Sequence, residues 1–209
     1  MIELLNIDCL EYMATQPDKS FDLAIVDPPY GINAAKSHTG KGWVVRESKD
    51  WDKQAPGAEY FNEIFRVSLN QIVWGANYMT PFLPASQHWI FWDKGQRNFT
   101  LADGELAFTS FDKALRVFEM SRGAMLGEQG IEKKIHPIQK PIRLYDWLLH
   151  NYAKPGQRIL DTHLGSGSSA IAAHYFGCDF VGCELDEDYY NAAIERFKLA
   201  TAQQSIFEL

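Results

Sequence analysis

Residues 21–30 have the sequence FDLAIVDPPY, in which a short apolar run stops at two consecutive prolines. An apolar run of this length is typical of a strand buried in a sheet. The prolines cannot continue the strand, because their φ angles are fixed and neither residue has a backbone N–H to donate. The chain is therefore predicted to leave the sheet after Val26 as a stiff, extended elbow.

The elbow brings together the carboxylate of Asp27, the carbonyl groups of Pro28 and Pro29, and the ring of Tyr30. A flat base with an exocyclic amine has two N–H donors, which Asp27 and the Pro28 carbonyl can accept. The Tyr30 ring can stack on the same base, a contact that contributes about 1–3 kcal/mol. Taken alone, the tetrapeptide is equally typical of a rigid turn after a strand, since Asp and Pro are common turn residues.

A second motif follows a strand predicted at 158–160. Asp161 precedes a glycine-rich turn with Gly165 and Gly167, and an Ala-rich helix comes next. A strand, a glycine turn and a helix start together form a ligand pocket lined by backbone groups. Glu184 ends the next predicted strand, 19 residues after Gly165, the separation expected for a carboxylate that binds a ribose diol. This spacing indicates a nucleoside-containing cofactor and, by itself, does not exclude NAD.

The elbow helps to identify the cofactor. A hydride-transfer site has no obvious use for a group that grips an amine, whereas methyl transfer to an amine does. A sulfonium donor needs a ribose anchor and a glycine turn under its methionine part. The two motifs together therefore favour S-adenosylmethionine over NAD.

The chain has 209 residues, of which 46% are hydrophobic and 22% charged, which fits one α/β domain with a sizeable core. Its net charge of −7 argues against a DNA-binding surface spread over the whole protein. Acidic residues interrupt the apolar N-terminus, so no signal peptide is expected, and no apolar run reaches the length of a membrane span. The cysteines lack metal-ligand spacing. We expect a reduced, cytoplasmic protein without a metal site or a membrane partner.

Four ordered motifs resemble those of the S-adenosylmethionine-dependent DNA amino-methyltransferases. They are Asn6-Ile7-Asp8-Cys9, Asp27-Pro28-Pro29-Tyr30, His136-Pro137-x-Gln139-Lys140-Pro141 and Asp161-x-x-x-Gly165-x-Gly167. The catalytic motif precedes the glycine motif, which resembles the permuted β group of that family. Residues 161–168, DTHLGSGS, differ from the commoner Asp-Pro-Phe-x-Gly-Ser-Gly and resemble the small phage and prophage members. A Phe usually sits near the position of Thr162 and His163.

The resemblance implies an α/β, Rossmann-like sheet of seven mostly parallel strands, with one antiparallel strand and helices on both faces. Our sequence pattern places strands near residues 5, 24, 73, 90, 108, 159 and 181. We expect a single methyltransferase domain, 1–209, in which 31–56 and 97–135 are insertions that recognise DNA. Both insertions contain Lys or Arg and both are short, which suggests a brief target site or help from a second protomer in a homodimer.

The resemblance also implies the activity. The chain is expected to transfer a methyl group from S-adenosylmethionine to the N6 amine of an adenine flipped out of double-stranded DNA, as in restriction–modification systems. Asp27, Pro28, Pro29 and Tyr30 are the expected catalytic residues. The cofactor is expected to bind through Glu184 at the ribose, Asp8 and Cys9 at its adenine, Asp161, Gly165 and Gly167 at the methionine part, and Lys140 at the methionine carboxylate.

Other interpretations remain open at this stage. A cytosine-N4 methyltransferase is one, although Asp27 at the first motif position favours adenine. A nucleic-acid-binding protein with a methyltransferase fold but no catalysis is another, and an RNA substrate is a third. Individual residues also have structural interpretations: Asp8 as a helix N-cap, Asp161 as a support for the glycine turn, and Lys140 as a solvated side chain.

Overall fold

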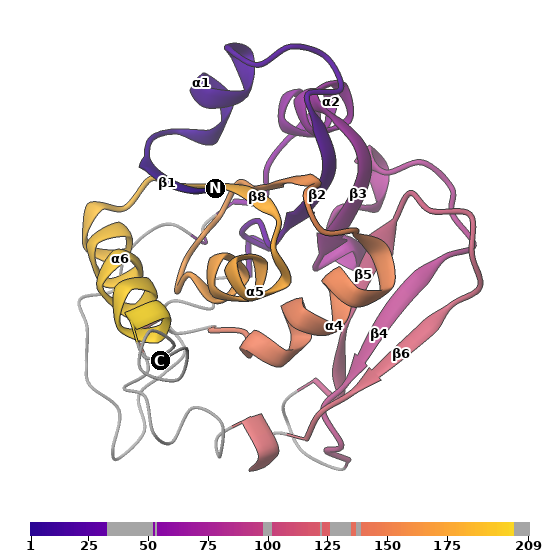
Figure 1. The fold of residues 1–209 in the computed structure, drawn as a ribbon. Coiled ribbons are helices and arrows are strands. Elements are labelled where there is room, and N and C mark those ends of the chain that lie inside the picture. Colours follow the sequence, from indigo (N-terminus) through magenta and orange to yellow (C-terminus); the bar gives the residue numbers. More distant parts are fainter. Residues whose placement is uncertain are drawn as a thin grey trace.

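The computed structural model shows an α/β fold in which helices cover both faces of one twisted sheet (Figure 1). It describes residues 1–32, 52, 54–97, 102–121, 123–125, 135–136 and 139–202. Most of the predicted insertion 31–56, and a large part of 97–135, lie outside the described residues. Within the part described, no helix has the length and apolar character needed to cross a bilayer.

The sheet has eight strands in the order β1-β8-β7-β2-β3-β5-β4-β6. All neighbouring pairs are parallel except the two that involve β5, which is antiparallel to both β3 and β4. The single antiparallel strand was predicted. The strands are β1 (Ile2–Asn6), β2 (Phe21–Val26), β3 (Ser68–Trp74), β4 (Trp89–Asp93), β5 (Gly104–Thr109), β6 (Arg116–Glu119), β7 (Arg158–Asp161) and β8 (Asp179–Glu184).

The predicted count of seven strands is wrong, because β6 adds an eighth at the edge of the sheet, beside β4. Only Phe118 of its four residues is buried, and the other three side chains are exposed. A strand this short, with polar and charged residues, has neither a continuous apolar run nor a long alternation. Only the pairing with β4 identifies these residues as a strand, and the local sequence does not predict that pairing.

The helices lie on both faces of the sheet, as Figure 1 shows. On one face α1 (Cys9–Ala14) and α2 (Ala58–Val67) pack against alternate residues of β2, Ala24 and Val26. On the other face α4 (Ile142–Tyr152), α5 (Ser168–Phe176) and α6 (Glu187–Ala202) pack in the cluster that contains Leu23 and Ile25. Two short 3-10 helices follow β3: η2 (Ala76–Tyr78) and η3 (Thr80–Phe82).

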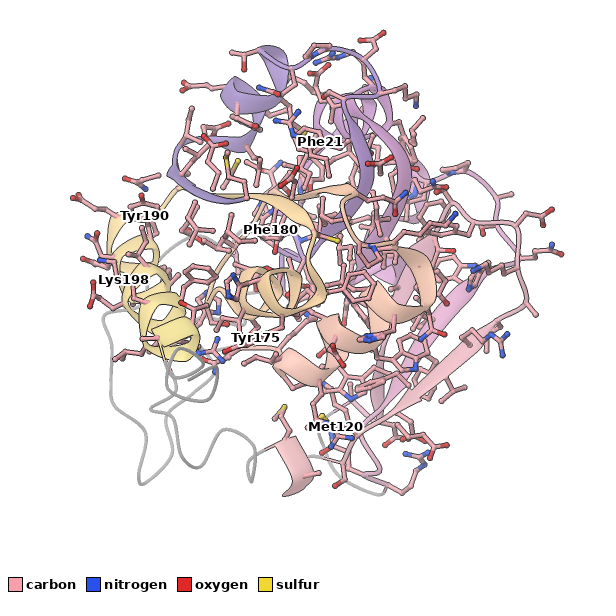
Figure 2. All side chains as sticks on the ribbon, in the orientation of Figure 1. Phe21, Met120, Tyr175, Phe180, Tyr190 and Lys198 are labelled. Carbon is pink, nitrogen blue, oxygen red and sulfur yellow. The ribbon has the colours of Figure 1, made fainter. Side chains whose placement is uncertain are left out.

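Because layers cover both of its faces, β2 is buried along most of its length, and Phe21 has no exposed surface at all. Figure 2 shows the corresponding contrast: Phe21 and Phe180 lie within the body of the molecule, whereas Lys198 projects from the outer side of α6. Fully burying an apolar side chain of this size contributes about 1.5–3 kcal/mol. The strand before the prolines is therefore anchored, and so is the elbow that follows it.

The reversal of β5 matters for the site. Trp92 near the end of β4 pairs with Glu105 near the start of β5. Because β5 runs antiparallel to both β3 and β4, it begins at the edge where those two strands end. The first residues of β5 therefore lie at the carboxyl edge of the sheet. Glu105 therefore reaches the same edge as Asp27, although the sequence places the two far apart.

Candidate active site

Four acidic residues follow, or end, four neighbouring strands. Asp8 comes after β1, Glu184 ends β8, Asp161 ends β7 and Asp27 follows β2. These strands are consecutive in the sheet and all parallel, so their carboxyl ends meet at one edge. Ligands bind in this position in open α/β sheets. The structure thus brings the elbow motif and the glycine motif to the same edge.

The side chain of Asp27 is almost enclosed, with 11% of its surface exposed. Its Oδ1 accepts a hydrogen bond from the Tyr30 hydroxyl at 2.7 Å, and its Oδ2 contacts the Nζ of Lys140 at 2.5 Å. Pro28 is buried and Pro29 is partly exposed. The elbow is therefore rigid through its prolines and is also fastened by its own Asp and Tyr.

Gly75 and Tyr78 both contact the ring of Tyr30. Gly75 has φ +66°, and a Cβ added there would lie 2.0 Å from Cε1 of Tyr30 and 2.4 Å from both Cδ1 and Cζ. These three distances place the added atom directly over the ring, so Gly75 leaves room for Tyr30. Tyr78, which is 48% exposed, stacks on Tyr30 with centroids 5.3 Å apart and planes inclined by 17°. The sequence analysis assigned no role to either residue.

Two further charged residues complete the surroundings of Asp27. Lys140 contacts Oε2 of Glu105 at 3.2 Å, and Oε1 of Glu105 contacts Nζ of Lys94 at 2.5 Å. The Tyr30 hydroxyl lies 3.3 Å from Oε2 of Glu105. Glu105 and Lys94 were not among the predicted site residues. The signal that could have identified them as site residues is their position at the junction of β4 with the antiparallel β5.

Burial and these neighbours shift the acid–base behaviour of the cluster. Burial raises the pKa of Asp27, and the positive charge of Lys140 opposes that rise. Burial acts in the same direction on Glu105, but Lys140 and Lys94 outweigh it and lower the pKa of Glu105 to about 2. For Lys140, burial would lower the pKa, yet Asp27 and Glu105 raise it above the usual value. The cluster therefore keeps Lys140 and Glu105 charged.

Lys140 was predicted to pair with the carboxylate of a cofactor. In the structure its ammonium group contacts Asp27 and Glu105, with only 5% of the side chain exposed. Its backbone carbonyl accepts a hydrogen bond from the Ser168 hydroxyl at 2.8 Å, at the start of α5. Lys140 therefore joins the elbow to the helix that follows the glycine turn.

The glycine turn needs the left-handed backbone that glycine adopts readily, with φ +52° at Gly165 and +74° at Gly167. The N–H of Gly165 donates to Oε2 of Glu184 at 2.8 Å, while Oε1 of Glu184 accepts from the N–H of Asp186 at 3.0 Å. A Cβ added at Gly165 would have no neighbour closer than 3.8 Å. The turn therefore places glycine backbone beside a fixed carboxylate, with the ring of His136 within van der Waals range of a Cβ at Gly165.

Asp161 lies beneath this turn with 1% of its surface exposed. It accepts hydrogen bonds from the His163 N–H at 3.0 Å and from the Ser169 hydroxyl at 2.6 Å. Burial raises the pKa of Asp161 to about 7, and the negative charges of Asp27 and Glu184 add to that rise. Both contacts hold the turn, which supports the structural interpretation of Asp161. Because β7 lies between β8 and β2 in the sheet, Asp161 lies between Glu184 and Asp27.

Asp8 is the N-cap of α1. Its Oδ1 accepts hydrogen bonds from the N–H groups of Leu10 at 2.7 Å and Glu11 at 3.3 Å. Cys9 is the first residue of that helix, and burial, together with the charge of Asp8, raises the pKa of its thiol to about 12. Cys9 is therefore a neutral thiol at physiological pH.

Thr162 and His163 stand where the related motif usually has a Phe. The Tyr60 hydroxyl and Oγ1 of Thr162 are 2.6 Å apart, and Oγ1 is 2.9 Å from Nδ1 of His163. Burial lowers the pKa of His163 to about 4, so the imidazole is neutral at pH 7. A polar chain anchored on α2 thus replaces the usual aromatic contact. Within the described part of the chain, no three His, Cys, Asp or Glu side chains gather as metal ligands would.

The fold and the edge define an α/β protein with a site for a nucleoside-containing ligand beside a carboxylate elbow. Residues 73–195, more than half of the chain, match the model of the N6_N4 DNA methylase family. The chain belongs to this family. DNA methylases of the family take their methyl group from S-adenosylmethionine.

Curated relatives agree with this assignment. The putative methylase YubD of Escherichia coli K12 is 26% identical over 99% of this chain and 93% of its own length. The type II methyltransferase M.HinfI of Haemophilus influenzae is 24% identical over 93% of this chain and 68% of its own length. Both alignments run through almost the whole chain, so they include the elbow as well as the glycine turn.

Solved structures share the fold. The M1.HpyAVI complex with S-adenosylmethionine has a TM-score of 0.59 and 21% identity, and the match covers 94% of this chain and all of that one. The PvuII DNA methyltransferase, which is cytosine-N4-specific, has a TM-score of 0.63 and 13% identity, with 94% and 86% covered. At these identities the likeness establishes the fold alone.

Proposed function

We propose that this chain is a site-specific DNA methyltransferase that transfers a methyl group from S-adenosylmethionine to the N6 amine of adenine. The observation that carries the proposal is the position of Asp27. Its carboxylate lies at the same sheet edge as the glycine turn and Glu184, next to the acid that supports that turn. An amine acceptor and a methyl donor bound at these two places would meet.

The residues present fit S-adenosylmethionine. The glycine turn, shaped by Gly165 and Gly167, takes the methionine part beside Glu184. Glu184 is held by two backbone N–H groups, and each of its oxygens keeps a lone pair for a ribose hydroxyl. Asp8 and the Cys9 backbone take the adenine end. When bound, the cofactor supplies an electrophilic methyl group on a positively charged sulfur.

The elbow prepares the amine. Asp27 and the Pro28 carbonyl accept its two N–H groups, which localises the lone pair on the nitrogen, and Tyr30 stacks on the base. The nitrogen forms the new bond to carbon as the carbon–sulfur bond breaks, and the amine proton passes to Asp27 or to water. Reaching N6 requires the adenine to leave the stack, which costs a few kcal/mol. Alignment of the reacting groups supplies most of the acceleration.

Recognition of the DNA sequence belongs, in this proposal, to 31–56 and to the parts of 97–135 outside the sheet strands β5 and β6, within one domain that spans 1–209. Their short length fits a brief target, or a dimer in which a second protomer adds contacts. From the motif order we also propose that the chain belongs to the permuted β group, near its phage-type members. Binding through phosphate contacts would weaken steeply with added salt.

Cytosine-N4 methylation is the second candidate. It is supported by a family whose name covers both N6 and N4 amines. Cytosine offers the same pair of N–H donors to Asp27 and Pro28. The Asp at the first position of the elbow motif favours adenine.

Mass spectrometry of nucleosides separates these candidates. Purified protein is incubated with S-adenosylmethionine and DNA from a methylation-free host, and the DNA is digested. We expect N6-methyldeoxyadenosine from the wild type and none from Asp27→Ala, with cofactor affinity nearly unchanged in that variant. The variant Asp146→Ala, on an exposed part of α4, is the matched control. N4-methyldeoxycytidine would support the second candidate, and unmodified DNA would refute both.

A further inference from the structure

Four charged side chains at the elbow form a chain of ion pairs, which we call the charge cluster: Asp27, Lys140, Glu105 and Lys94. Its members alternate in sign, with contacts of 2.5 Å between Lys140 and Asp27, 3.2 Å between Lys140 and Glu105, and 2.5 Å between Glu105 and Lys94. Two positive and two negative charges cancel. Taking charges out of water is costly unless they are paired in this way.

The cluster is assembled from four separate places in the chain. Asp27 follows β2, Lys94 follows β4, Glu105 is the second residue of β5 and Lys140 precedes α4. Exposure increases outward, from 5% at Lys140 and 11% at Asp27 to 22% at both Glu105 and Lys94. Lys140 is therefore the inner cation, and Glu105 with Lys94 lies between it and solvent.

Each N–H donor of the Lys140 ammonium group has an acceptor, either in the charge cluster or in Tyr30. An ammonium group has three N–H donors. Its nitrogen lies within hydrogen-bond distance of three acceptors: Oδ2 of Asp27, Oε2 of Glu105 and the Tyr30 hydroxyl oxygen at 3.3 Å. It also lies 5.6 Å from the centroid of the Trp74 ring. These contacts orient the ammonium group toward the elbow.

We propose that Lys140 and Glu105 are positioning residues for the methyl-transfer step: Lys140 is the counter-ion that holds Asp27 ionised and in place, and Glu105 fixes Lys140 there. The proposal rests on the methyltransferase function proposed above and deepens it. Lys94 in turn fixes Glu105. Lys140 thus serves the amine side of the site rather than the carboxylate of the cofactor.

The chemical reason is that only an ionised carboxylate can accept the amine proton donors without competing as a donor itself. Burial disfavours the ionised form, as the raised pKa of Asp27 indicates, and a cation at 2.5 Å favours it. Glu105 has the opposite effect on Asp27, because it is a like charge. Removing Lys140 and removing Glu105 must therefore shift the titration of Asp27 in opposite directions.

Other ionisable groups also surround Asp27. They are Tyr30 at the elbow itself, Tyr60 from α2, Tyr145 from α4 and Asp161 from β7. Burial raises the pKa of each of these tyrosines well above its usual value, so they remain neutral across the range in which a carboxylate titrates. Asp161 is unchanged in all the variants compared below, so it cannot produce shifts of opposite sign.

The test measures kcat against pH for two substitutions, each of which removes one charge. Lys140→Met should move the acid limb to higher pH by about one to three units, and Glu105→Gln should move it to lower pH. Lys140→Arg keeps the charge and should leave the limb close to that of the wild type. Lys198→Met and Glu195→Gln make the same charge changes in an exposed pair on α6 and should shift nothing. Shifts of the same sign, or none, would overturn the proposal.

A second readout does not depend on catalysis. Carbon-13 NMR of the Asp27 carboxyl group in the cofactor-free protein should show the same two opposite pKa shifts. If the wild type failed to methylate DNA but these shifts appeared, the charge cluster would be correct and the proposed function wrong. If methylation occurred without the shifts, the proposed function would be correct and the roles proposed for Lys140 and Glu105 would be wrong.

Cofactor binding tests the remaining part of the proposal. S-adenosylhomocysteine has a carboxylate, whereas 5′-methylthioadenosine lacks the whole amino acid part. Calorimetry with Lys140→Met should give an affinity for both compounds within about threefold of the wild type. A loss of tenfold or more for S-adenosylhomocysteine alone would show that Lys140 binds the cofactor carboxylate, and would overturn the proposal.

Discussion

Gly75→Ala is expected to inactivate the enzyme by a purely steric route. The added methyl carbon would lie 2.0 Å from Cε1 of Tyr30 and directly over its ring. Two carbon atoms in contact are about 3.5–4.0 Å apart. The ring, or the backbone of the turn, must therefore move by roughly 1.5–2 Å. Tyr30 cannot move this far and keep its 2.7 Å hydrogen bond to Asp27.

The cost of the substitution has two parts. The φ of +66° at Gly75 is unfavourable for alanine, by roughly 1–2 kcal/mol. Displacement of Tyr30 adds a loss of alignment, and a misplacement of about 1 Å can lower a rate by about 100-fold. We expect kcat to fall by at least about 100-fold, with cofactor affinity nearly unchanged, since Glu184 and the glycine turn are untouched.

Gly156→Ala is the matched control. Gly156 has φ +82°, so the backbone strain is similar, but an added Cβ there would have no neighbour within 4 Å. Urea unfolding should show a loss of stability from backbone strain in both variants and a further loss in Gly75→Ala from the contact with Tyr30, whereas only Gly75→Ala should lose methyl transfer. A Gly75→Ala enzyme with kcat within a few-fold of the wild type would refute the steric argument.

Two other substitutions test Glu184 as the ribose ligand and Asp161 as the buried support of the glycine turn. Glu184→Ala should raise the Kd for S-adenosylmethionine by about tenfold or more, roughly 1.4 kcal/mol, in calorimetry; an unchanged Kd would exclude Glu184 as the ribose ligand, and Glu195→Ala is its exposed control. The pKa of Asp161 in the folded protein is about 7, above the ordinary value of 3.8. Between these two pH values the folded state binds more protons than the unfolded state, so the free energy of unfolding falls as pH rises. Asp161→Asn should remove this decline, on the order of a few kcal/mol in urea unfolding; an equal decline in the variant would contradict the assignment.

The parts of the fold that the sequence predicts are those determined locally. The apolar run of β2 and its prolines, the glycine turn and the acid at the end of β8 each follow from neighbouring residues. Their convergence at one edge follows from a general rule of parallel sheets. The short strand β6 was missed because only Phe118 in it is buried, and pairing with β4 alone determines its place.

The parts of the site that the sequence did not reveal depend on contacts between distant residues. Glu105 reaches Asp27 only because β5 runs against its neighbours, and the contact of Gly75 with Tyr30 depends on the turn after β3. The role of Lys140 is the clearest case. Its motif suggested a cofactor ligand, whereas its contacts in the folded protein lie on the elbow side of the site. Asp8 and Asp161 show the structural roles that the sequence analysis had kept open.

The essential idea is that the proline elbow holds a nucleobase amine beside the methyl donor. A crystal structure of the protein with S-adenosylhomocysteine and a duplex that contains its methylated sequence would measure this arrangement. We expect an adenine outside the helix, its N6 about 3 Å from an Asp27 oxygen, its ring on Tyr30, and the cofactor along Gly165 and Glu184. An adenine amine bound away from Asp27, or a cofactor away from the glycine turn, would contradict the proposed mechanism.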